Sequence, residues 1–431
     1  MSINDFFQSE LGVNPQILSL VDKAEHKIKQ RFRQIDQLSE YNQGKILKYM
    51  KQCKISARHF QPSTGYGYGD EGRDQLEKLF ALVFGAEDAL VRPQWGSGTH
   101  VISDALYGVL RPGDRLISIT GKPYDTLEET IGINNQSLNN GSLLDWGISY
   151  DQIDLDPMGK INIEEVLKLL DKPNSKAVFI QRSRGYEWRP SIPIGEMKEV
   201  ISKIKSKHPD VFILVDNCYG EFTCEIEPSH IGADLTVGSL IKNPGGGLAP
   251  TGGYAVGTKR AIELLSYRLT SPSVGREVGS YAASYLPFYQ GLFMAPHVVG
   301  ESLKGMTLGA NIFQSLGFEV LPNWEEDRSD IIQCINFNTD EELITFCQAI
   351  QWASPVDSHV TPIPWAMPGY SHEVIMAAGA FIQGASIELS ADAPIKEPYI
   401  AYLQGGLTYA HVKFALISTV SKLYEGGYIS L

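Results

Sequence analysis

Short apolar segments alternate with longer helical patterns between residues 75 and 260, and this alternation limits the possible folds more than any other feature. Six segments have the length and composition of buried strands: ALVRPQ (89–94), RLISIT (115–120), KAVFIQ (176–181), VFILVDNC (211–218), LTVGSLIK (235–242) and GGYAVGT (252–258). Helical patterns such as Ile161–Leu170 and Ile194–Lys207 lie between them. Apolar strands that alternate with helices predict an α/β sheet that is covered on both faces.

The chain on either side of this region follows other patterns. Apolar residues recur at helical spacing among the charges of residues 16–38, and a second helix is expected over 43–54. Beyond residue 300 the pattern is that of a smaller α+β domain. The sequence therefore predicts three parts: an N-terminal helical arm over 1–60, a large α/β domain over 61–295 and a small C-terminal α+β domain over 296–431.

The net charge and the cysteines exclude several classes of protein. Lys and Arg number 37 against 50 Asp and Glu, which gives a formal net charge of −13 and a surface that repels nucleic acid. Five cysteines without a C-x-x-C pair fit neither a disulfide framework nor a zinc site. Histidines such as His230, His359 and His372 also lack metal-ligand spacing. We therefore expect a cytoplasmic protein that binds no nucleic acid and no metal.

One uncharged stretch, residues 278–300, is long enough to cross a bilayer. Its prolines and tyrosines, together with Gln290 and His297, instead predict a buried helix or an interface. The first residues also lack the basic and then apolar regions of a signal peptide. No association with a membrane is expected.

Three polar features follow strands of the α/β region in chain order. The segment QWGSGTH (94–100) stands between a strand and a helix, where small residues let backbone N–H groups approach an anion. The hydroxyls of Ser97 and Thr99 add donors there. Asp216 ends one apolar strand, and Lys242 follows the next strand directly before a glycine-rich loop. Open α/β sheets bind ligands at the carboxyl ends of their strands.

Each feature has a common structural explanation when it is taken alone. Gly-Ser-Gly turns are frequent, an acid after a strand often caps a helix, and a lysine beside a loop often extends into solvent. Together they match one ligand, because pyridoxal phosphate (PLP) needs a cradle for its phosphate, an anion for its pyridinium nitrogen and a lysine for its aldehyde. The sequence contains neither a Walker A loop nor a dinucleotide-binding G-x-G-x-x-G.

The order of these motifs resembles that of one family over almost the whole chain. It is similar to the methionine γ-lyase-like, cystathionine β-lyase-like "aluminium resistance" branch of the fold-type I PLP-dependent enzymes. The segments that carry the resemblance are STGYGYGDEGRDQLE (63–77), QWGSGTH (94–100), GKPYDTLEE (121–129), QRSRGYEWRPS (181–191), VDNCYGEF (215–222), GSLIKNPGGG (238–247), TGGYAVG (251–257) and QGASIELSADAPIKEPY (383–399). The resemblance implies a mostly parallel, seven-stranded sheet in the large domain.

The resemblance also implies roles for the matching residues. Lys242 would form a Schiff base with PLP and later move the Cα proton, Asp216 would pair with the pyridinium nitrogen, and Tyr124 would stack on the pyridine ring. The phosphate would be held by Ser97, Gly98, Thr99 and Ser239. Asp216 and Lys242 suit these roles chemically, since an anion keeps the ring nitrogen protonated and a free lysine amine acts as a base.

Shared active sites are a further implication of the resemblance. Tyr66 or Tyr68, and Arg73, would reach the phosphate in a neighbouring subunit's site. A homodimer with two shared sites is then expected, within a homotetramer. From the residues alone, glycine-flanked tyrosines fit equally well as side chains packed in a loop.

The sequence departs from the broader group at three places. Ile241 stands where better-known lyases have a phosphate-binding hydroxyl, and Cys218 is expected to be a small packed side chain rather than a nucleophile. The arginine that commonly binds the substrate carboxylate from the C-terminal domain is also missing, because the last arginine is Arg328. The candidates for this role are Arg184, Arg189 and Lys396. An arginine is favoured since its planar guanidinium binds a carboxylate with two hydrogen bonds.

These residues predict a PLP-dependent carbon–sulfur lyase that eliminates a thiol from a sulfur-containing L-amino acid, of the cystathionine β-lyase or methionine γ-lyase type. The products would be a thiol, ammonia and a 2-keto acid. An aminotransferase, racemase or aldolase would use the same cofactor residues and stays an alternative. A non-catalytic stress or metal-binding protein is a less favoured alternative of another class.

Overall fold

The computed structural model describes residues 3–133, 139–367 and 372–431. Its contacts divide the chain into two compact units. We call Tyr41–Gly185 with Ser191–Ala295 the large unit, and Met1–Glu40 with Tyr186–Pro190 and Pro296–Leu431 the small unit. Residues 1–60 are thus divided between the two units. The three-domain division predicted from the sequence stays a prediction.

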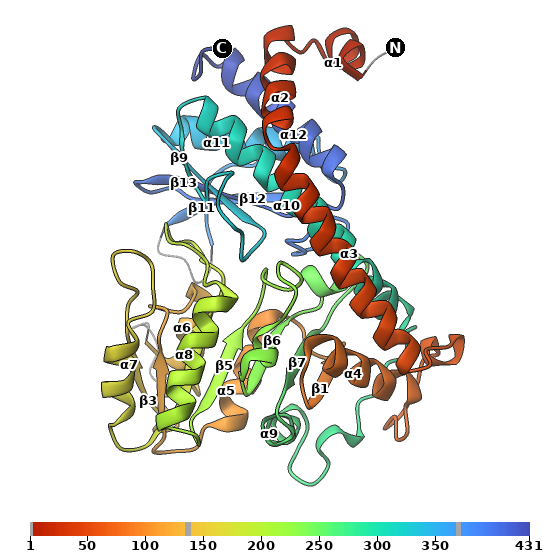
Figure 1. Ribbon diagram of the computed structural model, residues 1–431, viewed down its shortest axis with the longest axis vertical. Helices are drawn as coiled ribbons and strands as arrows, with labels where there is room; N and C mark the ends of the chain where they lie inside the picture. Colours follow the sequence, from red (N-terminus) through yellow and green to blue (C-terminus); the bar gives the residue numbers. More distant parts are fainter. Residues whose placement is uncertain (1–2, 134–138, 368–371) are drawn as a thin grey trace. The chain divides into compact units, whose positions relative to one another are not determined.

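The large unit is built on a mostly parallel sheet of seven strands, in the order β1-β7-β6-β5-β4-β2-β3 (Figure 1). The strands are β1 (Asp88–Arg92), β2 (Arg115–Ser118), β3 (Ser149–Gln152), β4 (Ser175–Gln181), β5 (Phe212–Asp216), β6 (Leu235–Ser239) and β7 (Gly253–Gly257). Strands β3, β2, β4, β5 and β6 pair in parallel, whereas β7 is antiparallel to both of its neighbours. The predicted fold class is therefore confirmed.

Both faces of this sheet are covered, because successive residues of its central strands enter two different cores. In β4, Ala177 and Phe179 join one core, and Val178 and Ile180 join the other. Helices α5 and α9 pack in the first core and α8 in the second. The helices of this unit are α4 (Glu71–Phe84), α5 (Gly98–Val109), α6 (Asp125–Ile131), α7 (Ile163–Leu170), α8 (Ile194–Lys207) and α9 (Lys259–Leu269). The short 3-10 turns are η1 (Ala57–Phe60), η2 (Pro228–Ile231), η3 (Asn243–Gly245) and η4 (Gly275–Glu277).

Strand β3 was not found from the sequence. Its residues, SYDQ, are polar and at most half-buried, and the strand pairs with β2 alone among the described strands of this sheet. A short polar edge strand carries no apolar pattern, because one of its sides has no neighbouring strand to bury it. Pairing along β2 therefore defines β3, and the local composition does not.

The small unit contains a six-stranded antiparallel sheet in the order β10-β11-β12-β13-β9-β8. Its strands are β8 (Glu319–Leu321), β9 (Ile332–Phe337), β10 (Trp365–Ala366), β11 (Glu373–Ala377), β12 (Ser390–Pro394) and β13 (Tyr399–Gln404). Its helices are α1 (Ile3–Leu11), α2 (Pro15–Lys27), α11 (Asp340–Trp352) and α12 (Tyr409–Glu425). Two helices, α3 (Lys29–Gln52) and α10 (Leu286–Ser315), each have residues in both units. One apolar core joins this sheet to α2, α11 and α12.

Helix α10 contains most of the uncharged stretch noted in the sequence, with Pro296 inside it. Among the residues that the structure describes, no helix combines the length and the apolar character that a bilayer span requires.

Candidate active site

Two predicted site residues stand at neighbouring strand ends. Asp216 is the last residue of β5, and Lys242 follows the end of β6 by three residues. These two strands are adjacent and parallel, so their carboxyl ends meet at one edge of the sheet. Strand β1, which runs in the same direction, leads into α5 at this edge. Asp216, Lys242 and the predicted phosphate turn are therefore brought together by the order of the strands.

The phosphate turn forms the N-terminus of α5. Ser97 is the N-cap residue, and its hydroxyl accepts a hydrogen bond from the backbone N–H of His100 at 3.1 Å. Helix N-termini attract anions, because their first N–H groups point outward without partners inside the helix. Thr99 lies in the first turn, where its Oγ1 is 3.1 Å from the hydroxyl of Tyr124. The turn thus offers backbone and hydroxyl donors in one place.

The close approach of Gly98 to two other strand ends completes this cradle. A Cβ at Gly98 would lie 3.5 Å from Cβ of Ser239 and 3.6 Å from Sγ of Cys218. The Ser239 hydroxyl is buried and has no hydrogen-bond partner among the described residues. A buried hydroxyl without a partner is costly, and a phosphate at the start of α5 would supply one. The residues present therefore fit the phosphate of PLP.

Asp216 is buried, with only 4% of its surface exposed. Its Oδ1 accepts a hydrogen bond from the backbone N–H of Cys218 at 3.1 Å, which fixes the carboxyl where the strand ends. Burial raises the pKa of Asp216, and the ammonium of Lys242 opposes this effect. Burial also raises the pKa of the Cys218 thiol, so this side chain stays protonated and is not an activated nucleophile.

The Lys242 ammonium lies 4.1 Å from the ring centre of Tyr219, within the range of a cation–π contact. Burial by itself lowers the pKa of Lys242. The surrounding polar side chains of Cys218, Tyr219, Asp216 and Tyr124 favour the ammonium form, outweigh burial and raise the pKa well above its ordinary value. Tyr219 was not identified from the sequence. Its backbone has a φ of 71°, which is unusual for a bulky residue. No sequence pattern predicts this conformation.

Tyr124 connects the phosphate turn to β4. Its backbone N–H donates to Oε1 of Gln181 at 2.9 Å, while its hydroxyl donates to Thr99. Burial raises the pKa of the Tyr124 phenol, so the hydroxyl stays protonated and keeps its donor. Thr99 also bonds Thr126 at 3.1 Å. These contacts hold the aromatic ring beside the phosphate turn.

A second acid, Glu221, lies against Gly238 of β6, and the sequence did not single it out. Glu221 is fully buried, and its Oε1 accepts a hydrogen bond from the Tyr254 hydroxyl at 2.8 Å. A Cβ on Gly238 would lie only 2.7 Å from that oxygen, so glycine makes room for the carboxyl. Asn243 donates to the Glu221 carbonyl at 3.0 Å. Burial raises the pKa of Glu221 to about 8.

The candidates for the substrate carboxylate are described in different units. Arg184 is buried in the large unit. Arg189 belongs to the small unit, where its Nε lies 3.0 Å from Oε2 of Glu187, and Lys396 is an exposed residue of that unit. The carboxylate role stays a prediction for each of them.

The residues expected to serve a neighbouring subunit differ in exposure. Tyr66 and Tyr68 are 72% and 67% exposed, and their ring centres lie 5.5 Å apart. Arg73 is buried instead, and it donates to the Gly67 carbonyl at 3.0 Å and pairs with Asp74 at 2.9 Å. In the structure Arg73 therefore binds the turn that displays the tyrosines.

The strand order and the strand-terminal acid and lysine define the class of this protein, which has the fold-type I architecture of PLP-dependent enzymes. The chain matches the family model for methionine gamma-lyase over residues 17–424. It therefore belongs to the methionine γ-lyase family and is a PLP-dependent carbon–sulfur lyase. The resemblance seen in the motifs is confirmed.

Similar proteins support this assignment. The chain is 56% identical to the uncharacterized protein YnbB of Bacillus subtilis (strain 168), over 91% of this chain and 93% of that protein. A carbon–sulfur lyase involved in aluminum resistance from Clostridium novyi NT is 49% identical, with a TM-score of 0.94 over 98% of this chain and 100% of that one. The PLP-dependent protein YhfS from Escherichia coli shares the fold at 16% identity and a TM-score of 0.59, over 90% and 97% of the two chains.

Proposed function

We propose that this lyase eliminates a thiol from a sulfur-containing L-amino acid of the cystathionine or methionine type, in the cytoplasm. The observation that carries the proposal is the meeting of Asp216, Lys242 and the N-terminus of α5 at one sheet edge. The Ser239 hydroxyl, which has no hydrogen-bond partner among the described residues, lies beside them. This set offers a phosphate cradle, an anion and an amine in the arrangement that PLP requires.

Each residue of this set has a distinct task in the proposal. Ser97, Gly98, Thr99 and Ser239 hold the phosphate, Asp216 keeps the pyridinium nitrogen protonated, and Tyr124 stacks on the ring. When bound, PLP supplies an electron sink for the bonds at the Cα of the amino acid. Lys242 removes the proton from Cα, and the thiol leaves from Cβ or Cγ. Asp216 is buried and Lys242 is half-buried, which strengthens their mutual attraction because few waters screen it.

We further propose that the protein works as a homo-oligomer, a dimer with shared sites within a tetramer. Tyr66 and Tyr68 support this part of the proposal, because they extend from the chain surface with most of their area exposed. Their hydroxyls would donate hydrogen bonds to the phosphate in the neighbouring site.

The cofactor part of the proposal is tested by the visible spectrum of the purified protein, recorded before and after borohydride treatment. A yellow protein whose reduced adduct maps to Lys242 is the expected result, and Lys242→Ala should give no adduct. A protein that remains colourless after PLP is added would contradict the proposal and favour the non-catalytic alternative.

The reaction part is tested by incubation with cystathionine or methionine in the absence of any added keto acid. Formation of a thiol with pyruvate indicates β-elimination, and a thiol with 2-ketobutyrate indicates γ-elimination. A protein that makes a keto acid only when a second keto acid is supplied would be an aminotransferase. Racemised substrate, or aldehyde release without a thiol, would indicate the remaining alternatives.

A further inference from the structure

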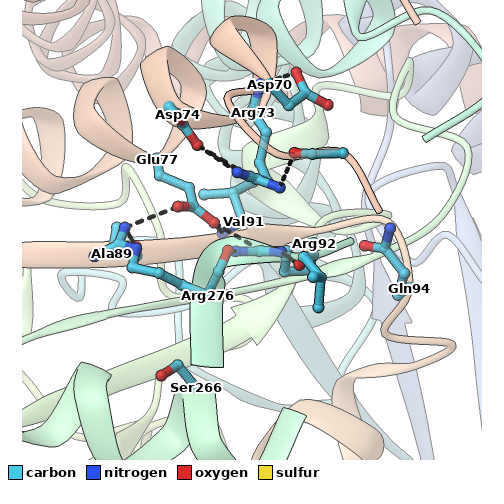
Figure 2. A network of polar contacts seen from close by, with 12 residues as sticks. Asp70, Arg73, Asp74, Glu77, Ala89, Val91, Arg92, Gln94, Ser266 and Arg276 are labelled. Carbon is cyan, nitrogen blue, oxygen red and sulfur yellow. Dashed lines mark hydrogen bonds and ion pairs between the residues drawn. The ribbon is translucent and has the colours of Figure 1, made fainter. Parts of the chain in front are cut away.

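A buried ion network joins α4 to the end of β1, and Figure 2 shows it together with Arg73. Nε of Arg92 donates to Oε1 of Glu77 at 2.7 Å, and both side chains are 1% exposed. The other oxygen of Glu77 accepts from Nη2 of Arg276 at 2.8 Å, while Nη1 of Arg276 pairs with Asp88 at 2.5 Å. We call Glu77, Arg92 and Arg276 the Glu77 cluster. A buried ion pair of this kind is retained only where all its charges are matched.

Arg92 uses its remaining donors on the backbone of the chain near Arg276. Its Nη1 donates to the Val278 carbonyl at 2.7 Å, and its Nη2 donates to the Arg276 carbonyl at 2.8 Å. Gly279 follows with a φ of 120°, and a Cβ there would lie 2.6 Å from Nη1 of Arg92. Three bonds in three directions require a planar guanidinium, which lysine cannot replace. Arg92 therefore fixes the course of residues 276–279.

The fixed segment in turn holds the backbone that carries the exposed tyrosines. The N–H of Gly279 donates to the Tyr66 carbonyl at 3.0 Å, and the Ser280 hydroxyl donates to the Gly65 carbonyl at 2.7 Å. Gln94 donates to the Ser280 carbonyl at 2.7 Å from the other direction. We call residues 63–69 the tyrosine turn. It is connected to the Glu77 cluster by this short series of hydrogen bonds.

The opposite side of the tyrosine turn is held as well. Arg73 donates to the Gly67 carbonyl, and a Cβ on Gly67 would lie 3.0 Å from Cα of Ser280, so the turn packs closely on the fixed segment. The rings of Tyr66 and Tyr68 nevertheless stay largely exposed. A rigid backbone that displays two amphipathic rings loses little conformational entropy when another surface receives them.

We propose that the Glu77 cluster positions the tyrosine turn for a second copy of this chain, so that an ion network in one subunit sets the PLP affinity of its neighbour's site. This inference rests on the proposed function, namely PLP binding at sites shared between two copies. Two phenol hydroxyls are hydrogen-bond donors that suit phosphate oxygens. Among the described residues, the Glu77 cluster makes no side-chain hydrogen bond or ion pair to a residue assigned to PLP, and we regard its members as positioning residues.

An effect within the same subunit is the competing explanation. Arg92 and Gln94 directly precede the phosphate turn at Ser97, so damage to the Glu77 cluster could also disturb this chain's own cradle. The two explanations differ in which subunit loses PLP affinity: the neighbour of the altered subunit or the altered subunit itself. An experiment with mixed oligomers separates them.

The first measurement is the PLP dissociation constant of Arg276→Gln. Arg276→Lys is the comparison variant, which keeps the positive charge but lacks the planar guanidinium that binds Glu77 and Asp88 together. Arg276 is suitable because it is about one-third exposed, so its loss is less damaging than that of Arg92. We expect Arg276→Gln to weaken PLP binding by about ten-fold, the equivalent of one hydrogen bond to a charged group. Ser280→Ala, which removes one bond to the tyrosine turn, is the second variant if Arg276→Gln does not fold.

The decisive measurement uses mixed oligomers in which Lys242→Ala subunits are in large excess. Nearly every subunit that retains Lys242 then has a Lys242→Ala subunit as its neighbour. Bound PLP is fixed by borohydride and counted on the Lys242 peptide. Arg276→Gln subunits should regain wild-type affinity beside Lys242→Ala neighbours, because the neighbour supplies an intact tyrosine turn. Wild-type subunits beside neighbours that carry both Lys242→Ala and Arg276→Gln should show the ten-fold loss.

The proposal would be overturned if PLP affinity fell only when Arg276→Gln is in the same subunit as Lys242. Unchanged PLP affinity in the homo-oligomers of both Arg276→Gln and Ser280→Ala would overturn it as well. A protein that stays monomeric and forms no mixed oligomers would overturn it too. Failure of the proposed function is distinguishable, because the wild-type protein would then bind no PLP at all.

Discussion

The Lys242 ammonium lies 4.1 Å above the ring of Tyr219, and the backbone of Tyr219 adopts a left-handed conformation to place the ring there. The ring stabilises the charged form of the lysine. Positive φ is costly for a residue with a Cβ, by about 1–2 kcal/mol. The contact therefore links the charge state of Lys242 to the conformation of the loop that follows β5.

Replacement of this ring should change the acidity of Lys242. We expect Tyr219→Ala to lower the pKa of Lys242, because the cation–π contact that stabilises the ammonium is lost. Tyr219→Phe keeps the ring but loses the phenol hydroxyl, so it should lower the pKa less than Tyr219→Ala does. The pH dependence of acetylation of Lys242, followed by mass spectrometry on the protein freed of PLP, measures it. Equal effects of both substitutions would contradict the role of the ring. Tyr219→Gly should be more stable than Tyr219→Ala, because glycine tolerates positive φ.

Substitution of Ser239 should show that this residue serves PLP binding and not the stability of the fold. Its hydroxyl is buried without a described partner, so Ser239→Ala should leave the PLP-free protein as stable as before or stabilise it by about 1 kcal/mol. PLP affinity should fall by about ten-fold, since one donor to the phosphate is lost.

Thr236 offers the matched control for this prediction. It lies in the same strand and also has a buried hydroxyl without a described partner, but its side chain is on the other face of β6. Thr236→Val should give the same stability change with unchanged PLP affinity. Urea unfolding and PLP titration measure the two quantities, and a loss of stability in Ser239→Ala without loss of PLP affinity would contradict the assignment.

Asp216→Asn should lower kcat by about 10²–10⁴, the range that a positioned proton-holding group contributes. Asparagine retains an oxygen for the hydrogen bond from the N–H of Cys218, so the fold should persist. Asp234→Asn is the control, because Asp234 precedes the start of β6, away from the site, and its carboxylate accepts from the N–H of Ile213 at 2.7 Å. Keto acid release measures both variants. Equal activity of the two would refute the role of Asp216.

Glu221 should make stability depend on pH. Burial raises its pKa from 4.5 to about 8, so between these values the folded chain holds a proton that the unfolded chain has lost. The free energy of unfolding should therefore fall as pH rises, by about 1.4 kcal/mol per pH unit from this group, and level off above pH 8. Urea unfolding across this range should show the slope in the wild-type protein and its loss in Glu221→Gln.

Tyr254 provides an independent check of this pH dependence. Its hydrogen bond stabilises the charged form of Glu221 and thereby lowers the pKa. Tyr254→Phe should consequently raise the pKa of Glu221 and extend the slope to higher pH. An unchanged slope in Glu221→Gln would instead assign the pH dependence to another group.

Much of the fold could be predicted because its signals are local. Of the seven strands described in the large unit, six carry the apolar runs that a covered sheet requires, whereas β3 has a polar composition and depends on its neighbour. Asp216, Lys242 and the turn at Ser97 stood out because strand ends in an α/β sheet share one edge whatever the details of packing.

The sequence by itself determined the class of fold, the family and the residues at the strand ends, since period, strand-terminal position and motif order are properties of the chain. The tertiary structure alone decided the surroundings of those residues. It placed Tyr219 over Lys242, buried Glu221 against Tyr254, and brought Arg276 to Glu77 across nearly two hundred residues. Such contacts depend on which segments pack together and on how burial changes the pKa of each charged group. No local sequence pattern predicts either of these.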